Sequence, residues 1–296
     1  MITIDSKIRH SITTVTNQIP PHLYFVGSAM FHYLGPSFAV LLFASVSVNG
    51  VAWLRIVSAA LIFLIWRNPW KTFLKANKES RNLILGLGVI FAVMNYSFYY
   101  AIDSLPLGTV AAIEFIGPII LALVAMRTFR NVIALTLTTL GVYFLTDMRL
   151  EGTPIGFIWA FINAACFMLY IILAHRLSKS DPNTKSIDRL GASIVIAGIC
   201  ITPLGIGGAI AAFDQPILIL AGIGVGISSS VIPYIFDQLA MARISRATYS
   251  LFVALFPATA VIIGIVVLGQ VPFWIEVVAV ILVIAGVIIV RDHKTE

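Results

Sequence analysis

The chain has 296 residues, of which 59% are apolar and only 11% are charged. Soluble domains carry roughly 25% charged residues, so this composition excludes a soluble enzyme, a soluble nucleic-acid-binding domain and a disordered chain. The net charge of +6 therefore needs another explanation. Cys166 and Cys200 each lie inside an apolar run without a CxxC motif, which argues against a disulfide framework and against a zinc site.

Long uncharged segments recur along the whole chain. The hydrocarbon core of a bilayer takes about 20 helical residues, and runs of that length predict an all-α integral membrane protein with ten transmembrane helices. In chain order the predicted helices are residues 23–43, 50–66, 83–102, 107–126, 131–146, 153–174, 190–210, 216–236, 247–268 and 272–290. Lys7 and Arg9 precede the first segment as in a signal peptide, but no small-x-small cleavage site follows, so we interpret it as an uncleaved helix.

The distribution of Lys and Arg predicts the orientation. Seventeen of these 19 residues fall in the two tails and in the loops after predicted helices two, four, six and eight, whereas only Arg149 lies on the opposite side and Arg55 lies inside a helix. This positive-inside signal predicts a multi-pass protein of the cell (inner) membrane with both termini in the cytoplasm. The basic charge is then a topology signal, and no nucleic-acid partner is expected.

The predicted helices divide into two sets of five. An odd number per half makes the second half enter the membrane in the opposite orientation, which is the inverted repeat of many secondary carriers. The predicted organisation is an N-terminal tail, two five-helix repeats and a C-terminal tail, at residues 1–21, 22–148, 149–290 and 291–296. No GxxxxGK[ST] phosphate loop occurs in the chain, so uphill transport would depend on an ion gradient.

Glu114 is the clearest charge inside a predicted span, where a charge costs about 2.5–3.5 kcal/mol. Pro118 has no N–H to donate to the carbonyl of Glu114, so this stretch offers a carboxyl group, a free carbonyl and a kink. Glu114 can hold a proton or bind a substrate ammonium, or it only neutralises Arg55. For Arg55 three alternatives stay open: binding a substrate carboxylate, pairing with Glu114, or snorkelling to the outer headgroups. His32 and Asn163 are interpreted as hydrogen-bonded packing residues.

Predicted helix three carries Asn95, Tyr96, Tyr99 and Tyr100. The three tyrosines stand at i, i+3 and i+4, so we expect them on one face of the helix. They either line a substrate cavity with hydroxyl groups or form an aromatic belt at the membrane interface. The belt is favoured for Tyr100, and the cavity is favoured for Asn95 and Tyr96.

Predicted helix eight carries Ser229, Pro233 and Tyr234. Pro233 cannot donate to the carbonyl of Ser229, which is therefore expected to be free. Serines in membrane helices more often mediate packing than bind ligands, and the Gly222-x-x-x-Gly226 motif favours a close helix–helix approach. The candidate substrate- or proton-binding residues are Glu114, Arg55, Asn95, Tyr96, Tyr99, Pro118, Ser229, Pro233 and Tyr234.

A group of short motifs resembles the drug/metabolite transporter superfamily, in its EamA-domain group. These motifs are Met94-Asn95-Tyr96, Phe98-Tyr99, Pro106-Leu107-Gly108 and Glu114-Phe115-x-Gly117-Pro118. Within that group the chain is most similar to the threonine/homoserine exporters of the RhtA type, over residues 25–290. The resemblance implies two inverted EamA repeats, cytoplasmic termini and proton-coupled export of small metabolites, often amino acids.

The chain differs from this branch at two positions. The branch usually has an acidic residue before the second-half proline, where this chain has Phe256 before Pro257, and it usually has Gly-Glu where this chain has Gly269-Gln270. Proton coupling would therefore depend more heavily on Glu114.

The expected function is secondary active export of small metabolites, foremost amino acids such as threonine and homoserine, by alternating access with proton antiport. A drug or nucleoside effluxer, or an uncoupled metabolite facilitator, is the alternative. An intramembrane enzyme would need a GxSxG serine with a histidine, HExxH or paired membrane aspartates, and the sequence contains none of them. The expected partners are a small-molecule substrate, the lipid bilayer and protons. No cofactor or metal is expected, and both a monomer and a homodimer are open.

Overall fold

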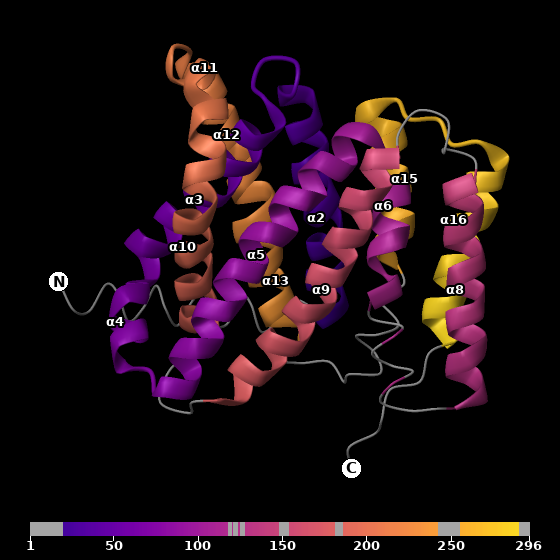
Figure 1. Cartoon of the computed structure of the whole chain (residues 1–296), viewed down its shortest axis with the longest axis horizontal. Coiled ribbons are helices and arrows are strands. Elements are labelled where there is room, and N and C mark those ends of the chain that lie inside the picture. Colours follow the sequence, from indigo (N-terminus) through magenta and orange to yellow (C-terminus); the bar gives the residue numbers. More distant parts are fainter. Residues whose placement is uncertain are drawn as a thin grey trace.

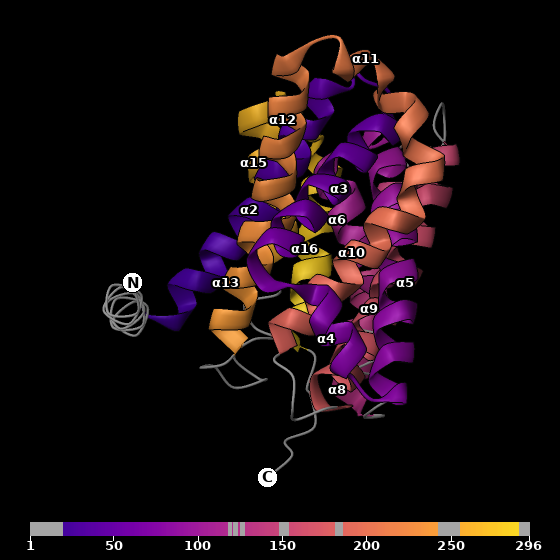
Figure 2. The same ribbon diagram turned by 90° about the vertical axis from the view of Figure 1, so that its left-hand side faces the viewer.

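The computed structural model describes residues 20–117, 120, 124, 128–147, 154–180, 186–241 and 255–289. These residues form a bundle of helices, and no strand occurs among them (Figures 1 and 2). The helices are α2 (Pro21–Leu42), α3 (Val48–Arg67), α4 (Pro69–Lys75), α5 (Lys78–Ser104), α6 (Leu107–Glu114), α8 (Phe129–Asp147), α9 (Pro154–Ser180), α10 (Ser186–Gly205), η1 (Ile206–Ala209), α11 (Ile210–Phe213), α12 (Pro216–Gly226), η2 (Ile227–Val231), α13 (Ile232–Met241), α15 (Leu255–Leu268) and α16 (Trp274–Ile289).

The all-helical prediction is confirmed for the described residues. Five helical stretches are long and apolar enough to cross a membrane: Val48–Arg67, Lys78–Ser104, Pro154–Ala174, Ile187–Phe213 and Pro216–Phe236. Three shorter apolar stretches are Val26–Leu42, Thr259–Leu268 and Trp274–Gly286. The later part of predicted span 107–126, including Pro118, and the start of span 247–268 lie outside the described residues.

Two short elements were not predicted from the sequence. One is α4, which follows α3 after Asn68, a residue with a left-handed backbone (φ 48°) that ends α3 and allows Pro69 to begin a new helix. The other is η2, one π-helical turn between α12 and α13. Such a turn redirects the backbone groups on one face of a helix and is frequent at functional sites.

Helices from the two halves of the chain pack against one another. The contacts pair α5 with α9, α13 with α2, α3 with α10, α6 with α15, and α8 with α16. The two glycines of the predicted packing motif lie where α12 meets α3: a Cβ at Gly222 would meet Leu54, and a Cβ at Gly226 would lie 2.7 Å from the carbonyl oxygen of Arg55. The close approach predicted from this motif is therefore confirmed.

The polarity of the bundle suits an apolar surrounding rather than water. Large apolar side chains cover the outside, among them Ile65, Ile199, Ile217 and Leu220, each more than 60% exposed. Polar side chains lie inside, among them Arg55, Asn95, Asn163, Ser229 and Ser230. Soluble domains bury charged residues only rarely, so the interior polar residues, Arg55 above all, are the candidates for binding a solute.

Candidate substrate-binding site

Arg55 lies in the interior of the bundle on α3, with only 5% of its surface exposed. Its Nε donates to the hydroxyl of Ser230 and its Nη2 donates to the backbone carbonyl of Ser229, both at 3.0 Å. Its guanidinium carbon lies 5.2 Å from the centre of the Tyr99 ring, within the range of a cation–π interaction. The snorkelling alternative for Arg55 is therefore wrong, because the side chain points into the protein.

The Ser229 carbonyl can accept a hydrogen bond from Arg55 because of Pro233, a feature that is visible in the sequence. Pro233 stands four residues later and has no N–H, so it cannot make the helical bond to this carbonyl. The π-helical turn η2 spans Ser229 and Ser230 and presents them to α3. The prediction of a free carbonyl at Ser229 is confirmed, and its partner is Arg55.

The Arg55 guanidinium retains capacity to bind an anion. A guanidinium has five N–H donors, and the hydrogen bonds to Ser229 and Ser230 use two of them. The hydroxyl of Tyr99 lies beside Arg55 and Ser229, is fully buried and has no hydrogen-bond partner among the described residues. Both side chains therefore keep N–H or O–H groups that a carboxylate can accept.

Glu114 lies at the end of α6 and is only partly buried, although every residue from Leu107 to Ile113 is buried. Its Oε1 accepts a hydrogen bond of 3.2 Å from Nδ2 of Asn163 on α9. His32, Tyr33 and Arg55 lie within electrostatic range of the carboxyl group. No ion pair within 4.0 Å joins Glu114 to Arg55, both of which the structure describes. The alternative of a direct structural pair is therefore wrong.

Asn163, which the sequence interpretation assigned to hydrogen-bonded packing, lies next to the Glu114 carboxyl group. It is fully buried, and its Oδ1 has no hydrogen-bond partner among the described residues. A lone asparagine in an apolar helix gives no signal of its own in a single sequence. Only the packing of α9 against α6 shows that its amide faces a carboxylate.

Aromatic rings surround the Glu114 region. The ring of Phe256 lies 5.4 Å from that of His32, 6.0 Å from that of Tyr33 and 5.9 Å from that of Phe115. Tyr234, buried on α13, lies 5.8 Å from the ring of His32. Phe256, which directly precedes Pro257 in the sequence, thus places an apolar ring in this region.

The three candidate tyrosines on α5 contact two different neighbours. Tyr99 points to Arg55, whereas Tyr96 and Tyr100 both pack on Trp159 of α9, at 6.1 and 5.2 Å between ring centres. The Tyr96 hydroxyl donates to that of Tyr100 at 3.3 Å. Asn95 is buried and donates from Nδ2 to the carbonyl of Phe91 in its own helix, at 2.7 Å.

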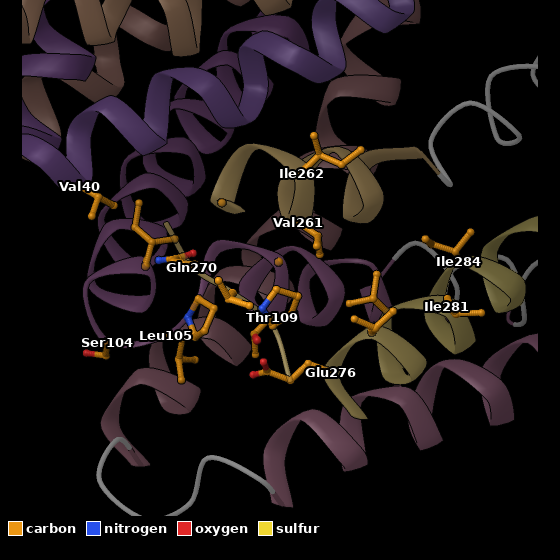
Figure 3. Close-up of a pocket in the computed structure, with 18 of the residues that line it drawn as sticks. Val40, Ser104, Leu105, Thr109, Val261, Ile262, Gln270, Glu276, Ile281 and Ile284 are labelled. Atoms are coloured by element: carbon orange, nitrogen blue, oxygen red, sulfur yellow. The ribbon is translucent and has the colours of Figure 1, made fainter. Parts of the chain in front are cut away.

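A cavity of about 570 Å³ lies at the end of the bundle where α5 ends and α6 begins, and we call it the upper cavity (Figure 3). Its walls come mainly from α5, α6, α15 and α16, and Figure 3 shows Thr109, Gln270 and Glu276 around it. Gln270 accepts a hydrogen bond of 3.2 Å at Oε1 from the N–H of Leu107, the first residue of α6. Oε2 of Glu276 accepts one of 2.9 Å from the N–H of Phe273.

Comparisons with known proteins agree with this arrangement. The EamA-like transporter family matches residues 154–291. The threonine/homoserine exporter RhtA of Salmonella typhimurium (strain LT2) is 31% identical over 256 residues, covering 85% of this chain and 84% of that protein. The protein of the same name from Escherichia coli (strain K12) is 32% identical over 240 residues, covering 80% of this chain and 79% of that protein.

These likenesses define a multi-pass membrane transporter rather than an enzyme. The chain belongs to the EamA-like transporters of the drug/metabolite transporter superfamily, in the RhtA-like branch.

Proposed function

We propose that this protein exports small amino acids, such as threonine and homoserine, across the cell membrane by alternating access. The observation that carries the proposal is that one apolar interior contains both a pair of hydrogen-bond donors and a pair of hydrogen-bond acceptors. Arg55 and Tyr99 offer free donors, and Glu114 with Asn163 offers free acceptors. A zwitterion brings a carboxylate for the first pair and an ammonium for the second, so both charges are neutralised inside the bundle.

The membrane arrangement that we propose has ten spans in two inverted repeats, at residues 22–148 and 149–290, with tails at 1–21 and 291–296. The helix contacts support it, because exchanging the two halves converts the α2–α13 contact into the α9–α5 contact. The same exchange leaves the α3–α10, α6–α15 and α8–α16 pairs unchanged. Both termini would then lie in the cytoplasm, on the side with 17 of the 19 basic residues.

This orientation gives the upper cavity a role. It would face the outside of the cell, next to the N-terminal half of α6, the helix that carries Glu114. A substrate released from the Glu114 region would leave through it. In carriers with inverted repeats, one repeat moves against the other around a site near the middle of the membrane.

Proton antiport would supply the driving force. One proton entering through 100 mV gives about 2.3 kcal/mol, which sustains roughly a fortyfold gradient of a neutral zwitterion. Glu114 would be the proton site. The titratable or charged groups that face it are His32 and Tyr33 of α2 and Arg55 of α3, while α9 contributes the neutral Asn163.

A second candidate keeps the fold but removes the coupling. Phe256 and Gln270 are neutral where the branch usually has acidic residues, which favours an uncoupled facilitator, or an effluxer of drugs or nucleosides. A protonophore separates the two candidates, because it abolishes only a gradient that protons maintain.

The deciding experiment measures loss of labelled threonine and homoserine from preloaded cells, with and without expression of this protein. Faster loss of either solute that a protonophore weakens would support proton-coupled export. Unchanged loss of both solutes would contradict the threonine/homoserine assignment. Faster loss that a protonophore leaves intact would favour the uncoupled facilitator.

A further inference from the structure

Only one of the two polar atoms of the Asn163 amide has a hydrogen-bond partner among the described residues. An ionised carboxylate can only accept hydrogen bonds, so in that form of Glu114 the amide nitrogen is the atom that faces it and Oδ1 is directed elsewhere. This oxygen is buried on a fully buried residue and has no partner among the described residues. Buried acceptors are normally satisfied, and one that is not is costly to leave unpaired. A donor that arrives with the substrate would satisfy it.

The surroundings indicate what kind of donor this is. An ionised Glu114 has several acceptor positions and uses one for Asn163, so it can neutralise a substrate ammonium unaided. The rings of Tyr33, Phe115 and Phe256 pack together beside this region and suit the apolar part of a small side chain. The Asn163 oxygen is a neutral, buried acceptor, and a single neutral donor satisfies it without leaving a charge unpaired.

We propose that Asn163 is a specificity-determining residue that accepts a hydrogen bond from a hydroxyl group on the substrate side chain. The inference rests on the proposed function, because it names the residue that would recognise the side chain of an exported amino acid. A site with a buried acceptor rejects an analogue that lacks the donor, because the acceptor is then left unpaired. Hydroxylated amino acids are therefore preferred over apolar analogues of the same shape.

The first test changes the substrate and leaves the protein intact. Threonine and valine differ by a hydroxyl in place of a methyl group, and O-methylthreonine keeps the oxygen but cannot donate. Initial efflux of each labelled amino acid is measured from vesicles that contain the wild-type protein. Threonine is expected to leave about tenfold faster than valine and O-methylthreonine, the effect of one lost hydrogen bond. Equal rates for threonine and valine would overturn the proposal.

The second test changes the residue and uses the threonine-to-valine ratio, which does not depend on how much protein reaches the membrane. Asn163→Leu keeps a similar volume without the acceptor, and the ratio is expected to fall close to one. Glu114→Gln lowers both rates but keeps the ratio, because the amide acceptor is retained. Asn131→Leu, which removes a fully buried amide from α8, is the matched control and leaves the ratio unchanged.

The outcomes separate this inference from the function on which it rests. If the wild-type protein moves neither threonine nor homoserine, the proposed function fails. If it moves threonine and Asn163→Leu keeps the wild-type ratio, export stands and the role of Asn163 is refuted. If Asn163→Leu does not reach the membrane, the wild-type comparison of threonine with valine decides the matter.

Discussion

Arg55 and Glu114 are ionisable side chains inside the same apolar bundle, but their surroundings differ. Arg55 is held by the carbonyl of Ser229, the hydroxyl of Ser230 and the ring of Tyr99, and 5% of its surface is exposed. Among the described residues Glu114 has one hydrogen bond, from Asn163, and it keeps part of its surface accessible. The Arg55 guanidinium is therefore held in place by several contacts, whereas the Glu114 carboxyl group can exchange its hydrogen bond to Asn163 for another.

This difference matches the two tasks that a coupled carrier must perform. A group that only orients the substrate benefits from a rigid setting, because pre-organisation lowers the cost of binding. A group that exchanges a proton for a substrate must be reachable in both forms, so a single neutral partner is an advantage. We therefore expect changes at Arg55 to remove binding in general and changes at Glu114 to remove coupling.

The largest effect is expected for Arg55→Lys. A lysine ammonium is a point charge that cannot reproduce the forked hydrogen bonds to Ser229 and Ser230, and these are hydrogen bonds of a charged group. Initial efflux of threonine should fall about a hundredfold at equal membrane abundance, as expected for about 2.7 kcal/mol. Arg67→Lys is the matched control, because the Arg67–Asp188 pair is partly exposed and contributes little. Comparable losses in both variants would contradict the anchor role of Arg55.

The next effect is expected for Glu114→Gln, which keeps the shape and removes the titration. Efflux should fall about tenfold, because a buried charge–ammonium contact becomes a neutral one. The remaining efflux should no longer respond to external pH, measured as rates across a pH series. His32 is a second ionisable side chain near Glu114, so His32→Gln is the control that should retain the pH response. A full pH response in Glu114→Gln would exclude Glu114 as the proton site.

A smaller effect, on stability, is expected where α12 approaches the anchored side of the site. Gly226→Ala would place a Cβ 2.7 Å from the Arg55 carbonyl oxygen, so α12 must move away from α3. Overpacking of this kind costs about 1–3 kcal/mol, and the unfolding temperature of the purified protein should fall. Gly224→Ala has nothing within 4 Å of the added Cβ and should be neutral or slightly stabilising. A similar fall in both variants would mean that the close contact between Gly226 and α3 is not the cause of the lost stability.

The sequence predicted the Arg55 side of the site better than the Glu114 side. Proline chemistry is local, so Pro233 alone predicted the free carbonyl of Ser229, and the Gly222–Gly226 spacing predicted a close helix contact. The partner of each group was not predictable, because α3 meets η2 and α6 meets α9 only through the tertiary packing of helices far apart in the chain.

The tyrosines of α5 show why helix periodicity was not sufficient. Tyr96, Tyr99 and Tyr100 are close on a helical wheel, but α5 is surrounded by several helices. Because Tyr99 is offset around the helix axis from Tyr96 and Tyr100, it contacts Arg55 whereas the other two contact Trp159. Asn163 makes the interhelical hydrogen bond that was expected of a packing residue. The sequence could not identify its partner, because an isolated amide in an apolar helix looks the same whether it faces a carboxylate or a carbonyl.

The smallest effect is expected for substitutions of Gln270. They test whether proton coupling needs a second acidic residue besides Glu114. Gln270→Ala removes the acceptor for the Leu107 N–H at the start of α6, which should cost about 0.5–1.5 kcal/mol of stability. Gln270→Glu keeps that acceptor and adds a negative charge near a helix N-terminus, so the unfolding temperature should be retained or rise slightly. Threonine efflux should change less in either variant than in Glu114→Gln, because Gln270 supports α6 from its far end while Glu114 faces the interior. If Gln270→Glu instead increased the pH response of efflux several-fold, the neutral side chain at position 270 would be what limits proton coupling. A carboxyl group at the upper cavity would then bind the proton together with Glu114.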